Sequence, residues 1–125
     1  MSDTVRDLVI IGGGPAGLSA AIYASRSMLD AVTLEREATG GQMVLTGEID
    51  NYPGLPGTDG YGLAEAMRAQ AEGLGAHLEM DLVTSVGRDE ATGLFSVSTS
   101  TGVYQAKCVI AALGARPHRA GFEGE

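Results

Sequence analysis

The chain contains 125 residues, of which 44% are hydrophobic and 19% are charged, enough for one globular domain and too apolar for a disordered tail. Its 16 acidic and 8 basic side chains give a net charge of −8, which excludes a surface that neutralises the phosphates of a nucleic acid. Residues 1–7 have mixed charge and precede no apolar run of about 20 residues, so we expect a cytoplasmic protein without signal peptide or membrane span.

The first part of the chain predicts a β-α-β unit. Residues 7–11 form a short, β-branched apolar run that is typical of a strand buried on both faces of a parallel sheet. Residues 15–28 are rich in helix formers and begin with Pro15, which costs no hydrogen bond in the first turn of a helix. Residues 31–35 predict the second strand, and the unit has the length of about thirty residues that a right-handed crossover needs.

The remaining pattern predicts a loop, a helix and further strands. Residues 36–61 hold six glycines and two prolines without a sustained period, so we expect a long functional loop. A helix over 62–74 is expected to end at Gly75 and to lead into a third parallel strand at 76–80. Alternating polarity predicts an antiparallel three-stranded meander at 82–87, 94–99 and 103–106, followed by a separate buried strand at 108–113. The expected fold class is therefore α/β, Rossmann-like, with a parallel sheet plus this meander.

A glycine motif lies between the first predicted strand and the first predicted helix. Gly12, Gly14 and Gly17 fit the pattern G-x-G-x-x-G. In that pattern the first glycine permits a tight turn, the second lets the backbone touch a pyrophosphate, and the third lets the helix lie close to the strand. Helix-terminal N–H groups then bind the phosphates without a lysine, which suits an acidic protein. The alternative is a glycine-rich turn that binds nothing.

Two further features fit a dinucleotide site. Glu35 ends the second strand, where a carboxylate accepts hydrogen bonds from ribose hydroxyls and favours FAD or NAD over NADP; the alternative is a solvated strand-end charge. In the long loop, Gln42, Thr46 and Asn51 are neutral hydrogen-bonding residues on a glycine-rich backbone and are suited to a polar heteroaromatic ring. The alternative for these three is an ordinary polar turn.

The remaining candidate residues indicate no further site. Cys108 is the single cysteine, which excludes an internal disulfide or a Cys-x-x-Cys pair, and we expect it to be a small buried hydrophobe. His77 and His118 stand far apart without other ligands at metal-binding spacing. We therefore expect no metal site and no catalytic residue within this chain.

The order of these motifs closely resembles the FAD domain of bacterial thioredoxin reductases. The shared pattern is the glycine motif, the acidic strand end, Gly-Gly-Gln at 40–42, Asn-Tyr-Pro-Gly at 51–54, the segment 110–117, and Gly-Glu at 124–125. The resemblance implies a set of FAD-binding positions: Gly12, Gly14, Pro15, Ala16, Glu35, Gly41, Gln42, Thr46, Asn51, Val83, Ala112 and Gly114. One departure is Leu113, which stands where the family carries a threonine and removes a hydroxyl contact.

Within this set, the resemblance implies a different part of FAD for each group of residues. Gly12, Gly14, Pro15 and Ala16 would hold the pyrophosphate, and Glu35 would bind the ribose. Gln42, Thr46 and Asn51 would lie along the ribityl and isoalloxazine portions, and the backbone of Val83 would meet the adenine. Ala112 and Gly114 would close the turn over the phosphate side of the flavin.

The resemblance also implies how the chain would function. Residues 1–118 would be the first segment of a discontinuous FAD domain, and 119–125 would begin the linker to an NADPH domain that carries the Cys-x-x-Cys disulfide. The whole enzyme, as a homodimer, would pass electrons from NADPH through FAD to thioredoxin or a similar disulfide protein. The alternatives are a related flavin reductase that uses ferredoxin as donor or a peroxiredoxin as acceptor, and a non-catalytic module that binds FAD or NAD.

Overall fold

The computed structural model describes residues 4–116 and 118–124 and contains one six-stranded sheet with the strand order β3-β2-β1-β6-β5-β4. The strands are β1 (Val5–Ile11), β2 (Ala31–Glu35), β3 (His77–Met80), β4 (Val83–Arg88), β5 (Phe95–Thr99) and β6 (Val103–Ala111). The helices are α1 (Pro15–Arg26), the short 3-10 helix η1 (Gly41–Leu45) and α2 (Gly60–Gly73). Residues 1–3, Pro117 and residue 125 lie outside the described residues. The parts of the expected segments 1–118 and 119–125 that fall on them are therefore not described.

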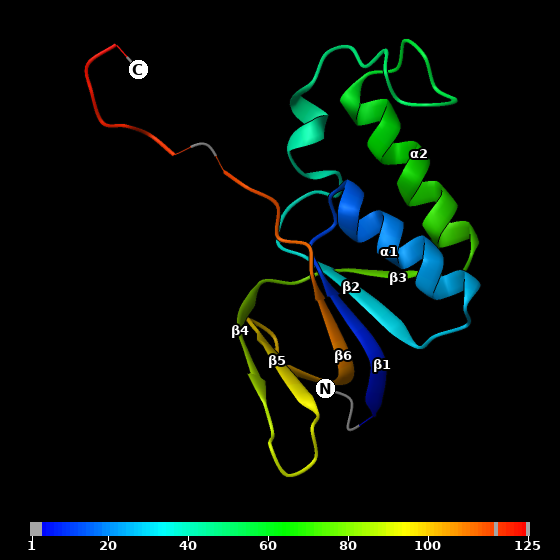
Figure 1. The fold of residues 1–125 in the computed structure, drawn as a ribbon, viewed down its shortest axis with the longest axis vertical. Coiled ribbons are helices and arrows are strands. Elements are labelled where there is room, and N and C mark those ends of the chain that lie inside the picture. Colours follow the sequence, from blue (N-terminus) through cyan, green and yellow to red (C-terminus); the bar gives the residue numbers. More distant parts are fainter. Residues whose placement is uncertain (1–3, 117, 125) are drawn as a thin grey trace.

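Strand β1 lies at the centre of the parallel part of the sheet and is covered on both faces, as its apolar run predicts. Leu8 and Ile10 pack beneath α1, whereas Val9 and Ile11 pack on the other face with Val97 of β5. The alternation follows from the period of two in a strand. Figure 1 shows both helices over β1–β3, with the β4–β5 hairpin projecting at the far end of the molecule.

The two helices begin and end close to the positions that the sequence indicates. Helix α1 begins at Pro15 as predicted but ends at Arg26, because Met28 adopts a left-handed conformation (φ 59°) that stops it. Helix α2 begins two residues earlier than expected, since the Asp59 carboxylate accepts a hydrogen bond from the N–H of Gly62 at 2.6 Å. Gly75 follows it at φ 94°, as expected of a terminating glycine.

The last strand corrects two predictions. Residues 103–106 and 108–113 were expected to form separate strands, but β6 is continuous over Val103–Ala111. One strand serves both partners because its first part pairs antiparallel with β5 and its length from Gln105 onward pairs parallel with β1. Cys108 and Ile110 are exposed, and not buried as expected, because both helices cover the β1–β3 side of the sheet (Figure 1).

The topology places a switch point at the carboxyl end of β1. From β1 the chain continues through α1 to β2 on one side, whereas β6 returns on the other side of β1. Neighbouring parallel strands that are connected in opposite directions form a topological switch point, where α/β sheets bind ligands. The turn 12–14 and the residues after β6 both lie at this end.

Candidate functional site

The glycine turn after β1 is packed so tightly that two of its glycines have no room for a side chain. Gly12 has φ 112° and donates its N–H to Leu34 C=O at 2.8 Å. A Cβ added to Gly12 would lie 2.0 Å from Ala112 O, and one added to Gly17 would lie 1.8 Å from Gly12 O. Gly12 therefore allows β6 to end against the turn, and Gly17 allows α1 to lie on it.

Gly14 differs because the space in front of it is open. It has extended backbone angles (φ −77°, ψ −170°), and in the described part of the chain a Cβ there would meet only Gly41 Cα, at 3.8 Å. Among the described residues, no acceptor binds the N–H groups of Gly14, Ala16 or Gly17 at the start of α1. Free N–H groups at the positive end of a helix, beside an open backbone, form a cradle for an anionic group such as a pyrophosphate.

Glu35 is bound to this turn. Its Oε2 accepts a hydrogen bond from the N–H of Gly13 at 2.7 Å, and its Oε1 accepts from the N–H groups of Arg36 at 2.8 Å and Glu37 at 3.3 Å. The side chain is partly buried, and it borders a hollow of about 370 Å³ between the ends of β2 and β3 and helix α2. The Glu35 carboxylate is therefore held by backbone N–H groups of the glycine turn and of the chain after β2, and its binding of a ribose stays a prediction.

The second glycine pair forms the opposite wall of the cradle. Gly40 donates its N–H to Gly13 C=O at 2.8 Å, and Gly41 (φ 62°) lies against Gly14. Gln42 follows at the start of η1, and its amide Nε2 donates to Ala115 C=O. The residues around Gly41 thus connect the glycine turn with the segment that follows β6.

The segment after β6 passes directly over the turn. Ala112 donates its N–H to Ile11 C=O at 2.8 Å, and Gly114 has φ 67°. Leu113, between them, is 72% exposed. Further on, the Arg116 guanidinium lies 3.1 Å from the Glu37 carboxylate. Ala112 and Gly114 therefore lie on the same side of the sheet as the glycine turn.

The other sequence-predicted residues lie farther from the turn. Thr46 is exposed and accepts a hydrogen bond from the N–H of Gly60 through its C=O at 2.8 Å. Asn51 lies in an exposed loop that is closed by the bridge between Ile49 and Thr58. Val83 begins β4 and packs with the cluster on the face opposite the helices. Within the described residues, none of these three predicted positions hydrogen-bonds to the glycine turn.

Sequence reasoning missed Asp81, which ties the crossover after β3 to the β5–β6 turn. Asp81 is 7% exposed, and its carboxylate accepts hydrogen bonds from the hydroxyls of Ser100 at 3.0 Å and Thr101 at 2.6 Å. Its N–H donates to Glu35 C=O at 2.9 Å, so it also extends the pairing at the end of β2. The partners stand 19 and 20 residues away in sequence, and no local pattern points to them.

These hydrogen bonds favour the charged form of Asp81. The hydroxyl of Thr101 lowers the pKa of Asp81 most, burial opposes this, and Thr99, Ser100 and the backbone of Leu82 lower the pKa further. The net result is a pKa below the value of a free aspartate.

We expect the stability of the protein to depend on the charge of Asp81. Because its folded pKa lies below the unfolded value of roughly 3.9, Asp81 stabilises the fold above that pH, and the stabilisation is lost as the pH falls through the folded pKa. Urea unfolding from about pH 7 to about pH 2 should therefore show a shallower acid loss of stability in Asp81→Asn than in the wild type. Thr101→Val should show an intermediate loss, and parallel curves for all three proteins would contradict this role.

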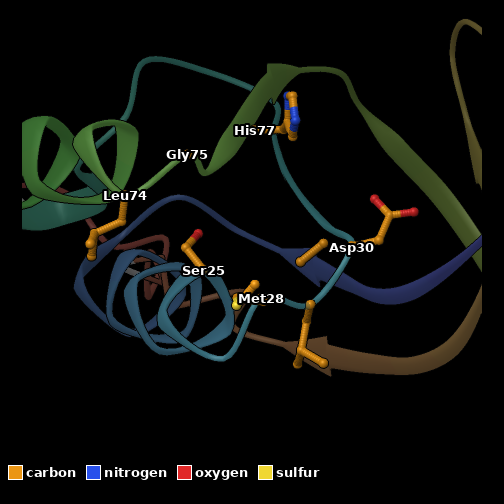
Figure 2. A pocket seen from close by; sticks show the side chains of 8 residues that line it. Ser25, Met28, Asp30, Leu74, Gly75 and His77 are labelled. Atoms are coloured by element: carbon orange, nitrogen blue, oxygen red, sulfur yellow. The ribbon is translucent and has the colours of Figure 1, made fainter.

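A second hollow, of about 280 Å³, lies away from the glycine turn (Figure 2). It is lined by Ser25 and Met28 at the end of α1, Asp30 before β2, and Leu74 and His77 around the start of β3. These residues lie at the amino ends of the strands, whereas the cradle lies at the carboxyl ends. The hollow is therefore separate from the candidate site.

The fold and the cradle together define a dinucleotide-binding domain of the Rossmann-like class. Residues 6–125 match the family model described as pyridine nucleotide-disulphide oxidoreductase. The chain belongs to this family.

Its similar proteins include several thioredoxin reductases. It is 40% identical over 124 residues to the enzyme named thioredoxin reductase of Treponema pallidum, and 42% identical over 124 residues to that of Peptoclostridium litorale, covering 98% of this chain in both cases. The crystal structure of Lactococcus lactis thioredoxin reductase superposes with a TM-score of 0.88 at 38% identity over 96% of this chain. The chain spans 40%, 39% and 39% of the length of these three proteins, respectively. The predicted Rossmann-like FAD-domain fold is confirmed.

Proposed function

We propose that the chain is the FAD-binding portion of a thioredoxin reductase-like flavoprotein oxidoreductase. The observation that carries the proposal is the open cradle at Gly14, where free N–H groups face a position that a Cβ would fill. The cradle needs no lysine, and it lies at the switch point of the sheet. The similarity to proteins named thioredoxin reductase supports the same assignment.

The proposal assigns a part of FAD to each group of candidate residues. We propose that Gly12, Gly14, Pro15 and Ala16 hold the pyrophosphate, and that Glu35 binds the adenosine ribose with the Oε2 lone pair that its backbone contacts leave free. Gly41, Gln42, Thr46 and Asn51 would border the ribityl chain and the isoalloxazine ring. Val83 would meet the adenine, and Ala112 and Gly114 would close the turn beside the phosphates.

The chain's own residues would bind and orient the cofactor. FAD, when bound, supplies a ring that accepts a hydride and passes electrons on. The neutral wall at Gln42 would hold the ring's polar edge, and the segment after β6 would exclude water above the phosphates. Cys108 is the single cysteine, so we place the disulfide that receives the electrons outside this sequence.

We further propose that residues 1–118 are the first segment of a discontinuous FAD domain and that 119–125 begin the linker to an NADPH domain. The exposed face of β6 supports this, because Cys108 and Ile110 (39% exposed) point to the helix side of the sheet without a covering helix in the described chain. We also propose that the intact protein is a cytoplasmic homodimer that reduces thioredoxin with NADPH. In the described residues, none of the helices has the length and hydropathy that a membrane crossing requires.

Turnover by the intact protein tests this function. We expect NADPH to reduce the bound flavin, and the reduced protein to reduce thioredoxin in a coupled assay. Reduced ferredoxin in place of NADPH, and a peroxiredoxin in place of thioredoxin, serve as competing donor and acceptor. Flavin reduction by ferredoxin alone, or failure to reduce any protein disulfide, would contradict the proposal.

A further inference from the structure

We infer that Glu35 is a positioning residue for the glycine turn and acts on the pyrophosphate end of the cofactor site through Gly13. This inference rests on the proposed function, because it assigns a second role to a residue of the proposed FAD site. If Glu35 made the ribose contact alone, it would affect only the binding of the adenosine part of FAD. Through Gly13 it also affects the binding of the pyrophosphate.

The contacts of Gly13 carry the inference. Gly13 N–H donates to Glu35 Oε2 at 2.7 Å, and Gly13 C=O accepts from Gly40 N–H at 2.8 Å. A Cβ added to Gly13 would lie 3.1 Å from Glu35 Cβ and 3.2 Å from its Oε2. The middle residue of the turn is therefore bound on both sides by groups more than 20 residues away in sequence.

Because the peptide bond is planar, these two contacts fix the orientation of the two peptide groups on either side of Gly13. In a trans peptide the C=O and the next N–H point in opposite directions. Since Glu35 binds the N–H of Gly13, the Gly12 C=O of the same peptide points away from Glu35, and it faces Gly17 of α1. Since Gly40 binds the C=O of Gly13, the N–H of Gly14 points away from Gly40. The free N–H of Gly14 is thereby held in one direction.

The other carboxylate oxygen anchors Glu35 itself. Oε1 accepts from the N–H groups of Arg36 and Glu37, so the side chain is fixed to the end of β2 while its second oxygen holds the turn. A glutamine has one carbonyl oxygen that accepts a hydrogen bond, whereas alanine has none. Glu35→Gln therefore keeps an acceptor for Gly13, and Glu35→Ala removes it.

Two ligands distinguish positioning from ribose binding. The probes are FAD and an FAD analogue whose adenosine ribose lacks the 2′ and 3′ hydroxyls, titrated into the intact protein with flavin fluorescence as the readout. We expect Glu35→Ala to lower the affinity for both ligands by about 10-fold or more, and Glu35→Gln to recover part of this loss of affinity. Glu90→Ala, which removes an exposed carboxylate in the turn between β4 and β5, is the matched control and should bind both ligands as the wild type does. If the loss in Glu35→Ala disappears with the analogue, the positioning role is overturned.

Amide hydrogen exchange tests the same contact without any ligand. We expect Glu35→Ala to speed exchange at Gly13, while Gly12, whose N–H donates to Leu34 C=O, keeps its protection. Unchanged exchange at Gly13 would overturn the inference even if FAD binds. A wild-type protein that binds no FAD but shows this exchange pattern would instead contradict the proposed function alone.

Discussion

Gly14→Val is expected to abolish FAD binding while leaving the chain folded. The substitution places a branched side chain in the open space before Gly14, where Gly41 Cα, at 3.8 Å, is the one atom of the described residues within 4 Å. The backbone angles of Gly14 lie in the extended region that valine favours, so the fold loses little. We expect affinity for FAD to fall by about 100-fold or more, which corresponds to about 2.7 kcal/mol. Flavin fluorescence titration measures the loss, and circular dichroism checks the fold.

A matched control for this change is Gly87→Val. Gly87 lies in β4, and a Cβ there meets nothing within 4 Å. Valine is favourable in a strand, so this variant should bind FAD as the wild type does. Equal FAD affinity in Gly14→Val and the wild type would show that the cradle at Gly14 is not the binding site.

Gly17→Ala is expected to lower the stability of the protein strongly. The added Cβ would lie 1.8 Å from Gly12 O, a backbone atom that cannot rotate away. Helix α1 would have to lift from the turn and from its contacts with Leu8 and Ile10. We expect the free energy of unfolding to fall by about 3 kcal/mol or more, the upper range for overpacked sites. Urea denaturation of the variant and the wild type measures the difference.

The control for this change is a glycine with free space in the other helix. Gly73 is the last residue of α2, and a Cβ there meets nothing within 4 Å. Gly73→Ala should stabilise the protein by roughly 0.5 kcal/mol, because alanine restricts the unfolded chain more than glycine does. A Gly17→Ala variant as stable as Gly73→Ala would contradict the close packing of α1 on the turn.

Local patterns predicted the elements of the fold well, and the failures have a common cause. The apolar run of β1 and the helix start at Pro15 depend on neighbouring residues, and both were confirmed. The sequence predicted two strands in place of β6, because the alternation of polar and apolar residues at 103–106 gives way to an apolar run at 108–113. Pairing with β5 ends at Ala106, whereas pairing with β1 runs from Gln105 to Ala111. The prediction that Cys108 is buried was wrong, because burial depends on which elements cover a strand, and this is not a local property.

In the candidate site, too, the features that depend on neighbouring residues were predicted and those that depend on distant residues were not. The spacing of Gly12, Gly14 and Gly17 predicted a turn whose tight contacts the structure displays. The contact between Glu35 and Gly13, and the two hydroxyls that bind Asp81, could not be predicted, because their partners are about 20 residues apart. Residues that act through their own backbone can therefore be predicted from sequence spacing, whereas residues that act through distant partners can be identified only once the fold is known.

Whether this chain binds FAD is decided by equilibrium binding of FAD to the intact wild-type protein. We expect the purified protein to show the visible absorption bands of oxidised flavin, or to take up added FAD to an equimolar ratio and keep it through gel filtration. Glycine-turn N–H groups and the wall at Gly41 are the groups that would hold it. A folded, colourless protein that fails to take up added FAD would contradict FAD binding at the glycine turn.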